Sequence, residues 1–254
     1  MKRALFFMYG VACYLIFFAT FLYAVGFLGN VLVPKSVDTG LQGGESNGWL
    51  IDIVLLSLFA IQHSVMARQG FKKWWTRLVP KPIERSTYVL FSSLALIALF
   101  WYWRPISDIT WNVRGSIGGT VLTATYFLGW GIVLFGTFLI NHFNLFGLHQ
   151  VYMTLRNREL APPQFVKPFF YRIVRHPLMV GFIIAFWSTP LMTVGHLLFA
   201  FASTGYILVA IQLEEKDLVR FHGQEYVQYQ KEVSQIIPMP PRRQYAGGST
   251  AENQ

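Results

Sequence analysis

Charged residues and cysteine are both scarce in this chain of 254 residues. Only 13% of the residues are Asp, Glu, Lys or Arg, whereas 54% are hydrophobic, and a soluble domain usually carries about twice as much charge. The single cysteine, Cys13, excludes an internal disulfide and lies within an apolar run, so we expect a packed, inert thiol. These shortages exclude a disulfide-linked fold and argue against a soluble protein.

Long segments without any charged residue dominate the chain. They cover residues 4–34, 53–67, 86–103, 115–155 and 177–213. Because a helix needs about 20 apolar residues to cross the hydrocarbon core of a bilayer, several of these segments can span it. We predict membrane-spanning helices over 5–28, 49–67, 86–104 and 118–140. In 177–213, Pro190 and Gly195 lie near the middle, which favours a hairpin of two short helices over one kinked helix.

The predicted fold is an all-α, polytopic membrane bundle of about five to six transmembrane helices. If the chain crosses at every proposed span, all 21 basic residues except Lys35, Arg104 and Arg114 lie on one side. This positive-inside bias places both termini in the cytoplasm. It also explains the net charge of +9 without a nucleic-acid partner.

Three regions follow from this organisation. Residues 1–140 form a four-span membrane region, and residues 141–238 form a C-terminal region that contains a cytoplasmic loop, the hairpin and a cytoplasmic helix. We expect that last helix to cover residues 214–234, with an interruption near Gly223. The tail, residues 239–254, is predicted to be disordered.

A basic motif, Arg175-His176-Pro177, immediately precedes the last apolar run. Pro177 suits the first turn of a helix, and Gly181 allows close approach of another backbone or a ligand. The free amides of that helix start, with Arg175 beside them, suit a carboxylate ligand. A snorkelling arginine at a prolyl helix start is the simpler alternative.

An acidic pair, Glu214-Glu215, directly follows the same run. Two adjacent acids are unexpected at a membrane boundary that is otherwise basic. They either bind the ammonium group of a ligand or form a salt bridge with Arg172 or Arg175. The hairpin places this pair and the basic motif at the same membrane face.

A third polar segment, residues 141–150, reads Asn-His-Phe-Asn-Leu-Phe-Gly-Leu-His-Gln. His142 and His149 are seven residues apart, which places them on one helix face, so we considered metal or haem ligation. No Cys or carboxylate nearby completes a ligand set, so we predict no metal site but a polar cap at the mouth of a cavity. His63 and His196 lie inside apolar runs and are expected to be hydrogen-bonded helix-packing residues.

The basic motif and the acidic pair together resemble the membrane methyltransferase group that includes isoprenylcysteine carboxyl methyltransferase and phosphatidylethanolamine N-methyltransferase. The C-terminal pattern of that group is Arg-His-Pro-x-Tyr-x-Gly, an apolar helical hairpin and Glu-Glu, and it covers residues 168–232 here. Tyr171, Tyr226 and Tyr229 also match the group. Met179 stands at the usual tyrosine position of the motif and leaves an apolar wall there.

Within that group, residues 141–150 resemble the methanethiol S-methyltransferases, as do the chain length and the four N-terminal spans. The resemblance implies a bacterial cytoplasmic-membrane enzyme that transfers a methyl group from S-adenosylmethionine to a small thiol on the cytoplasmic side. The products would be S-adenosylhomocysteine and dimethyl sulfide. The implied cofactor-binding residues are Gln150, Tyr171, His176, Pro177, Gly181, Glu214, Glu215, Tyr226 and Tyr229. The candidates for activating the thiol are His142, His149 and Arg175.

Three alternative functions remain at this point. The nearest is the same chemistry on a lipid, by a phospholipid N-methyltransferase or a prenylcysteine carboxyl methyltransferase. The second is a haem-binding membrane isomerase that uses His63, His142, His149 or His196. The third is a non-enzymatic membrane scaffold, which leaves the Arg-His-Pro and Glu-Glu elements without a purpose.

Overall fold

The charge-free segments form long helices, because a helix satisfies every backbone hydrogen bond internally where no water is present. The structure, a computed structural model, describes residues 1–40, 47–160 and 166–238. Five helices in this part are long and apolar enough to cross a membrane: α1 (Lys2–Gly29), α2 (Gly48–Ala67), α4 (Lys81–Tyr102), α5 (Ile117–Leu139) and α9 (Val194–His222). They confirm the four predicted N-terminal spans and the all-α, polytopic membrane bundle. The predicted disordered tail lies outside the described residues.

Shorter elements connect these spans. They are α3 (Gln69–Trp75), β1 (Ile109–Asn112), α6 (His142–Leu145), α7 (Leu148–Leu155), the 3-10 helix η1 (Phe169–Arg172), α8 (Pro177–Trp187), β2 (Leu191–Thr193) and α10 (Gln224–Glu232). β1 and β2 pair antiparallel and were not predicted, because each strand is only a few residues long. Their pairing connects the loop after α4 to the turn of the C-terminal hairpin.

The C-terminal hairpin is present, but its two helices differ greatly in length. α8 has 11 residues, about 16 Å, and covers only part of a hydrocarbon core. The chain turns at residues 188–193, where Pro190 lies, as predicted. The expectation of two short helices is wrong for α9, which has 29 residues and continues beyond the apolar run. It ends at His222, and Gly223, with a φ of 61°, separates it from α10, as predicted.

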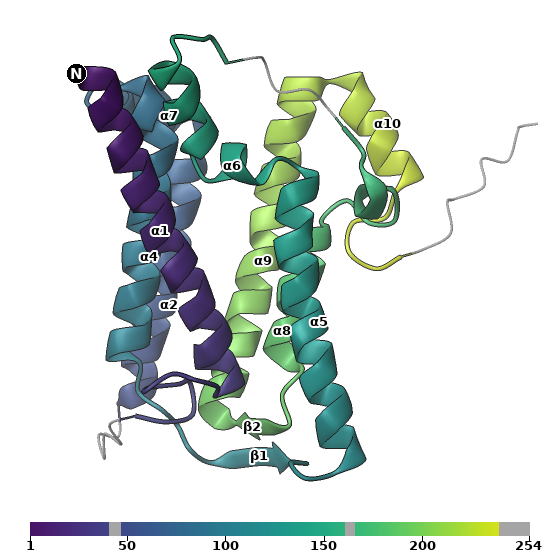
Figure 1. Cartoon of the computed structure of the whole chain (residues 1–254). Helices are drawn as coiled ribbons and strands as arrows, with labels where there is room; N and C mark the ends of the chain where they lie inside the picture. The colour runs from purple at the N-terminus through teal and green to yellow at the C-terminus, as the bar shows by residue number, and fades with distance from the viewer. Residues whose placement is uncertain (41–46, 161–165, 239–254) are drawn as a thin grey trace, which may run out of the picture.

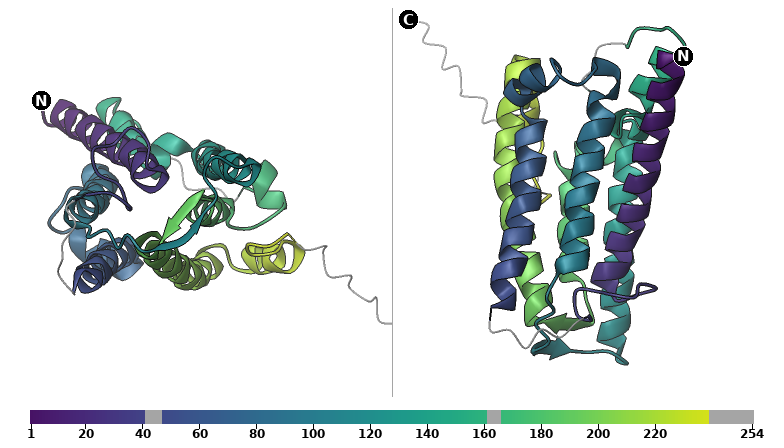
Figure 2. Two further views of the ribbon diagram at one scale, coloured as in Figure 1. Left: turned by 90° about the horizontal axis from the view of Figure 1, so that it is seen from below. Right: turned by 90° about the vertical axis from the view of Figure 1, so that its left-hand side faces the viewer.

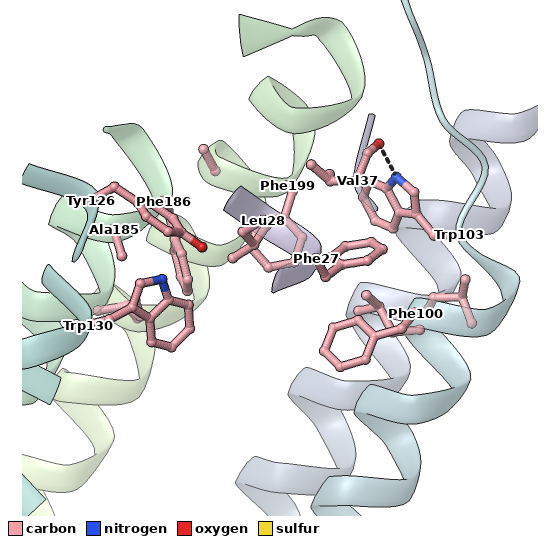
Figure 3. Packing of buried hydrophobic residues seen from close by; sticks show 14 of the residues in the cluster. Phe27, Leu28, Val37, Phe100, Trp103, Tyr126, Trp130, Ala185, Phe186 and Phe199 are labelled. Carbon is pink, nitrogen blue, oxygen red and sulfur yellow. Dashed lines mark hydrogen bonds between the residues drawn. The ribbon is translucent and has the colours of Figure 1, made fainter. Parts of the chain in front are cut away.

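The helices form two groups that lie side by side (Figures 1 and 2). α4 packs against α1, α2 and α7 in one group, and α8 packs against α5 and α9 in the other. A shared aromatic core joins the groups near the β1–β2 pair, with Phe27, Phe100 and Trp103 facing Phe199 (Figure 3). Trp103 Nε1 donates a hydrogen bond to the carbonyl of Val37 at 3.0 Å. The N-terminus and α10 lie at the opposite end, which we call the α10 end.

Two glycines bring α5 and α8 into backbone contact. A Cβ atom at Gly129 would lie 2.7 Å from the nitrogen of Ala185 and 2.8 Å from the oxygen of Gly181. A Cβ at Gly181 would lie 2.8 Å from the oxygen of Gly129. Helices in a membrane gain little from the hydrophobic effect when they associate. Small residues such as these glycines stabilise their association because they allow close van der Waals packing.

We predict that Gly129→Ala lowers the melting temperature of the detergent-solubilised protein. The added methyl group would separate α5 from α8, and such overpacking costs about 1–3 kcal/mol. Gly131→Ala is the matched control, since Gly131 lies on the same helix and a Cβ added there would have nothing within 4 Å. The control gains helix propensity and should melt at the same temperature or higher. Equal destabilisation by both variants, measured by differential scanning fluorimetry, would contradict this packing.

Candidate functional site

Glu215 lies at the centre of a buried polar cluster near the α10 end. Its side chain is only 9% exposed. Oε1 accepts hydrogen bonds from Arg175 Nε at 2.7 Å and from His176 Nε2 at 2.9 Å. Oε2 accepts from Arg175 Nη2 at 3.2 Å and from Gln230 Nε2 at 2.9 Å. A carboxylate has about four acceptor positions, so these four bonds use the capacity of Glu215 inside the protein.

Arg175 attaches the segment after α10 to the start of α8. Its Nη1 donates to the carbonyl of Gln230 at 3.1 Å and to that of Val233. Its backbone N–H donates to Ser234 O at 2.8 Å, next to an isolated parallel bridge between Val174 and Ser234. The guanidinium therefore binds protein groups. The salt bridge with Arg175 that the sequence allowed for the acidic pair is present at Glu215, and a ligand carboxylate or a thiolate is not its partner among the described residues.

Glu214 is in a different situation from its neighbour. Its side chain is 48% exposed, and its nearest cationic partner is His176 Nδ1 at 3.7 Å. Burial, then the charge of Glu215 and to a smaller extent that of Glu214, raise the pKa of Tyr226 above its ordinary value. Burial, and then the charge of Glu214, raise the pKa of Tyr171 above its ordinary value. Glu214 is thus the weakly paired carboxylate of the cluster.

Two tyrosines of α10 pack against the segment before α8. Tyr226 is 2% exposed and Tyr229 is 3% exposed, and the Tyr229 hydroxyl donates to the carbonyl of Tyr171. Burial raises the pKa of Tyr229 to about 12, so it remains a neutral donor at physiological pH. The ammonium of Lys167 lies 4.9 Å from the Tyr229 ring centroid and 3.3 Å from Glu232 Oε2.

The start of α8 has the predicted geometry. Pro177 occupies the first helical turn and His176 is the residue before it. Gly181, one turn later, makes its close approach to Gly129 and Val133 of α5. The backbone approach expected from this glycine is therefore a helix–helix contact in the structure.

His142 bridges three elements. Thr137 Oγ1 donates to Leu134 O at 2.6 Å, so it accepts from His142 Nδ1, which lies 2.7 Å away. The other ring nitrogen, Nε2, then accepts from the hydroxyl of Tyr14 at 2.8 Å. Burial lowers the pKa of His142 below its ordinary value. Both nitrogens of this side chain are thus occupied by α1 and α5.

His149 and Gln150 lie on α7, and the expectation that His142 and His149 share one helix face is wrong. Gly147, with a φ of 91°, separates α6 from α7. The side chain of His149 is half-buried and makes no hydrogen bond among the described residues. Gln150 Nε2 donates to Asn144, and its Oε1 is buried without a partner in the same part of the chain.

Gln230 is a member of the cluster that the sequence did not reveal. It lies one residue after Tyr229 in a polar helix, where a glutamine is an ordinary surface residue. Its hydrogen bond to Glu215 joins α10 to α9, and no local pattern in the sequence predicts a contact between two helices.

Within 1–40, 47–160 and 166–238, no group of three or more His, Cys, Asp or Glu could hold a metal ion.

We predict that Glu215→Gln loosens the α10 segment, whereas Glu214→Gln does not. The first change leaves the guanidinium of Arg175 buried without its carboxylate, and breaking a buried pair costs about 3–5 kcal/mol. Limited trypsin digestion at Lys231 and the melting temperature both measure the effect. Indistinguishable cleavage rates for the two variants would show that the Glu215 cluster does not hold this segment.

Comparisons with known proteins identify close relatives of the chain. It is 55% identical over 238 residues to the methanethiol S-methyltransferase of Crocosphaera subtropica, covering 94% of this chain and 93% of that protein. It is 52% identical over 242 residues to the methanethiol S-methyltransferase of Mycobacterium tuberculosis, covering 95% and 99%. Human nurim is 30% identical over 177 residues, 66% of each chain. No protein-family profile matches the chain, and no solved structure matches it.

Proposed function

Because this chain belongs to the methanethiol S-methyltransferase family, we propose that it transfers a methyl group from S-adenosylmethionine to methanethiol, giving dimethyl sulfide. The observation that carries the proposal is the identity of more than half the residues with a relative of that name over nearly the whole chain. The membrane bundle and the Arg175–Glu215 cluster support it. The donor supplies a methyl group made electrophilic by its bond to a sulfonium sulfur.

We assign the ammonium group of the donor to Glu214 rather than to Glu215. The four acceptor positions of Glu215 are used by three side chains of the protein. Glu214 is half exposed and lacks a hydrogen-bonded partner among the described residues. A carboxylate in this state fits an ammonium ligand, because a charge-assisted bond forms without breaking an existing one.

We assign the remaining contacts with the donor to residues that surround Glu214. His176 lies between the two carboxylates, and Tyr171 and Tyr226 are within range of the Glu214 charge. Pro177 begins a helix whose first free amides suit the donor's carboxylate. Arg175 holds the start of α8 in place through its ion pair with Glu215, so we assign it a positioning role rather than contact with the donor.

We also propose that the α10 end faces the cytoplasm of a bacterium. The loop between α2 and α4 and the segment from α7 to α8 carry nine of the 21 basic residues, and both lie at this end (Figure 1). The positive-inside bias places such an end in the cytoplasm, where S-adenosylmethionine is made. The relatives from Crocosphaera subtropica and Mycobacterium tuberculosis are both bacterial proteins.

The first test follows the reaction directly. Purified full-length protein in detergent is incubated with S-adenosylmethionine and methanethiol, and dimethyl sulfide in the headspace is measured by gas chromatography. We expect product that depends on both the donor and the protein. Absence of product from protein that still binds S-adenosylhomocysteine would contradict the thiol acceptor, and phospholipid or prenylcysteine acceptors would be assayed next.

The second test separates the two acids. Glu214→Gln removes the charge that we assign to the donor's ammonium, and losing a charge-assisted hydrogen bond weakens binding by about tenfold or more. Glu225→Gln is the matched control, since Glu225 is an exposed acid in the same C-terminal part of the chain. Isothermal titration calorimetry measures the affinity of both variants for S-adenosylmethionine. Unchanged affinity in a folded Glu214→Gln protein would remove this residue from the donor site.

A further inference from the structure

A second polar cluster lies inside the bundle near the α10 end. His63, one turn before the end of α2, lies between two side chains of α4. The hydroxyl of Tyr88 lies 2.9 Å from its Nε2 and 3.1 Å from its Nδ1, and Nδ1 is also 3.1 Å from Ser92 Oγ. Tyr88 is 6% exposed and Ser92 is 8% exposed. Ionisable groups inside a membrane span are rare and usually serve a function.

The hydrogen bonds give this cluster a direction. The hydroxyl of Ser92 donates to the carbonyl of Tyr88 at 3.0 Å, so Ser92 Oγ accepts the proton carried by His63 Nδ1. His63 Nε2 is then unprotonated and accepts from the Tyr88 hydroxyl. A basic nitrogen that is oriented by a third group and bonded to a hydroxyl is the arrangement by which enzymes activate a nucleophile.

The surroundings of Tyr88 suit a small apolar thiol. Its ring packs in an apolar cluster with Met66, Phe17 and Phe146. The guanidinium carbon of Arg85 lies 5.1 Å from the ring centroid, which provides a cation beside the site. Such an apolar, weakly hydrated environment favours a reaction in which charges are consumed rather than separated.

The same cluster is close to the proposed donor site. Arg68, directly after α2, forms an ion pair with Asp217 of α9 at 3.0 Å, three residues after Glu214. Tyr206 of α9 accepts a hydrogen bond from Ser64 of α2 at 3.2 Å, so α2 and α9 are in direct contact at this depth.

We propose that Tyr88 and His63 accept the thiol proton during methyl transfer. As the thiol sulfur forms its bond to the methyl carbon, its proton passes to the Tyr88 oxygen and the Tyr88 proton passes to His63 Nε2. The electron pair of the broken methyl–sulfur bond stays on the donor sulfur, which becomes a neutral thioether. The single positive charge moves from the sulfonium to the imidazolium, and the proton then leaves to solvent. This inference rests on the proposed function.

His142 has a similar arrangement, since its Nδ1 bonds to Thr137 Oγ1 and its Nε2 accepts from the hydroxyl of Tyr14. The two pairs differ in their surroundings. Tyr88 is 6% exposed, whereas Tyr14 is half-buried, and His63 lies on α2, which packs against α9. The helix that carries Glu214 is therefore a direct neighbour of the His63 helix.

The test compares turnover and its pH dependence in full-length variants. Tyr88→Phe and His63→Gln should each lower kcat for methanethiol about 100-fold at neutral pH, the scale of general-base catalysis. The deficit should narrow as pH rises, because more of the thiol ionises without help. Tyr126→Phe is the matched control, a buried tyrosine of α5 whose hydroxyl donates to Val25 O outside this cluster. Calorimetric affinity for S-adenosylhomocysteine should stay unchanged in all three variants.

A second pair of variants tests the orientation of His63. Ser92→Ala removes the acceptor that holds the proton on Nδ1, whereas Ser93→Ala removes a buried serine that bonds only to Val89 O in the described structure. Only Ser92→Ala should lower kcat and shift the pH dependence of kcat. A pH-independent deficit, or none, in Tyr88→Phe and His63→Gln would overturn the proton relay while the wild-type reaction stands. A wild-type protein without turnover would overturn the proposed function, and the relay with it.

Discussion

The carboxylate of Glu215 has to be paired, because an unpaired charge at the edge of a bilayer is costly. Arg175, His176 and Gln230 satisfy it, and they lie before α8 and on α10. One buried charge therefore connects the start of α8 to the C-terminal parts of α9 and α10. Successive residues of a helix point about 100° apart, so fixing Glu215 in this cluster turns Glu214 away from it. The availability of Glu214 for a ligand is a consequence of this constraint.

Much of the architecture could be predicted, since apolar length and charge position determine membrane spans directly. The Arg-His-Pro and Glu-Glu elements also meet as their order predicted. The sequence could not distinguish Glu214 from Glu215, because both are glutamates and their difference depends on Gln230 in another helix. It also could not show that Gly181 contacts α5 rather than a ligand. The roles of the two glutamates and of Gly181 depend on contacts between helices, which produce no pattern in the local sequence.

The two ends of the bundle use their polar groups differently. At the β1–β2 end, Asp38 accepts hydrogen bonds from Thr193 and Asn30, and its carboxylate lies 3.8 Å from the buried His196. These contacts attach the loop after α1 to the start of α9, although Asp52 Oδ2 and Arg104 Nε at that end lack hydrogen bonds among the described residues. At the α10 end, Glu214 and the Oε1 atoms of Gln62 and Gln150 lack hydrogen-bonded partners among the described residues. The half-exposed carboxylate of Glu214 is what favours ligand binding at the α10 end.

The balance of charge also favours a late proton transfer. The Arg175–Glu215 pair is neutral, and Glu214 offsets one positive charge of a bound donor. In the proposed relay, a thiolate formed in advance would require a protonated His63 beside Tyr88, whose ring lies 5.1 Å from the guanidinium of Arg85, and two cations repel strongly in an apolar site. If the proton moves only as the sulfur attacks, the sulfonium charge disappears while the imidazolium charge forms. Arg85 then repels the imidazolium and promotes loss of its proton, which restores the neutral histidine for the next turnover.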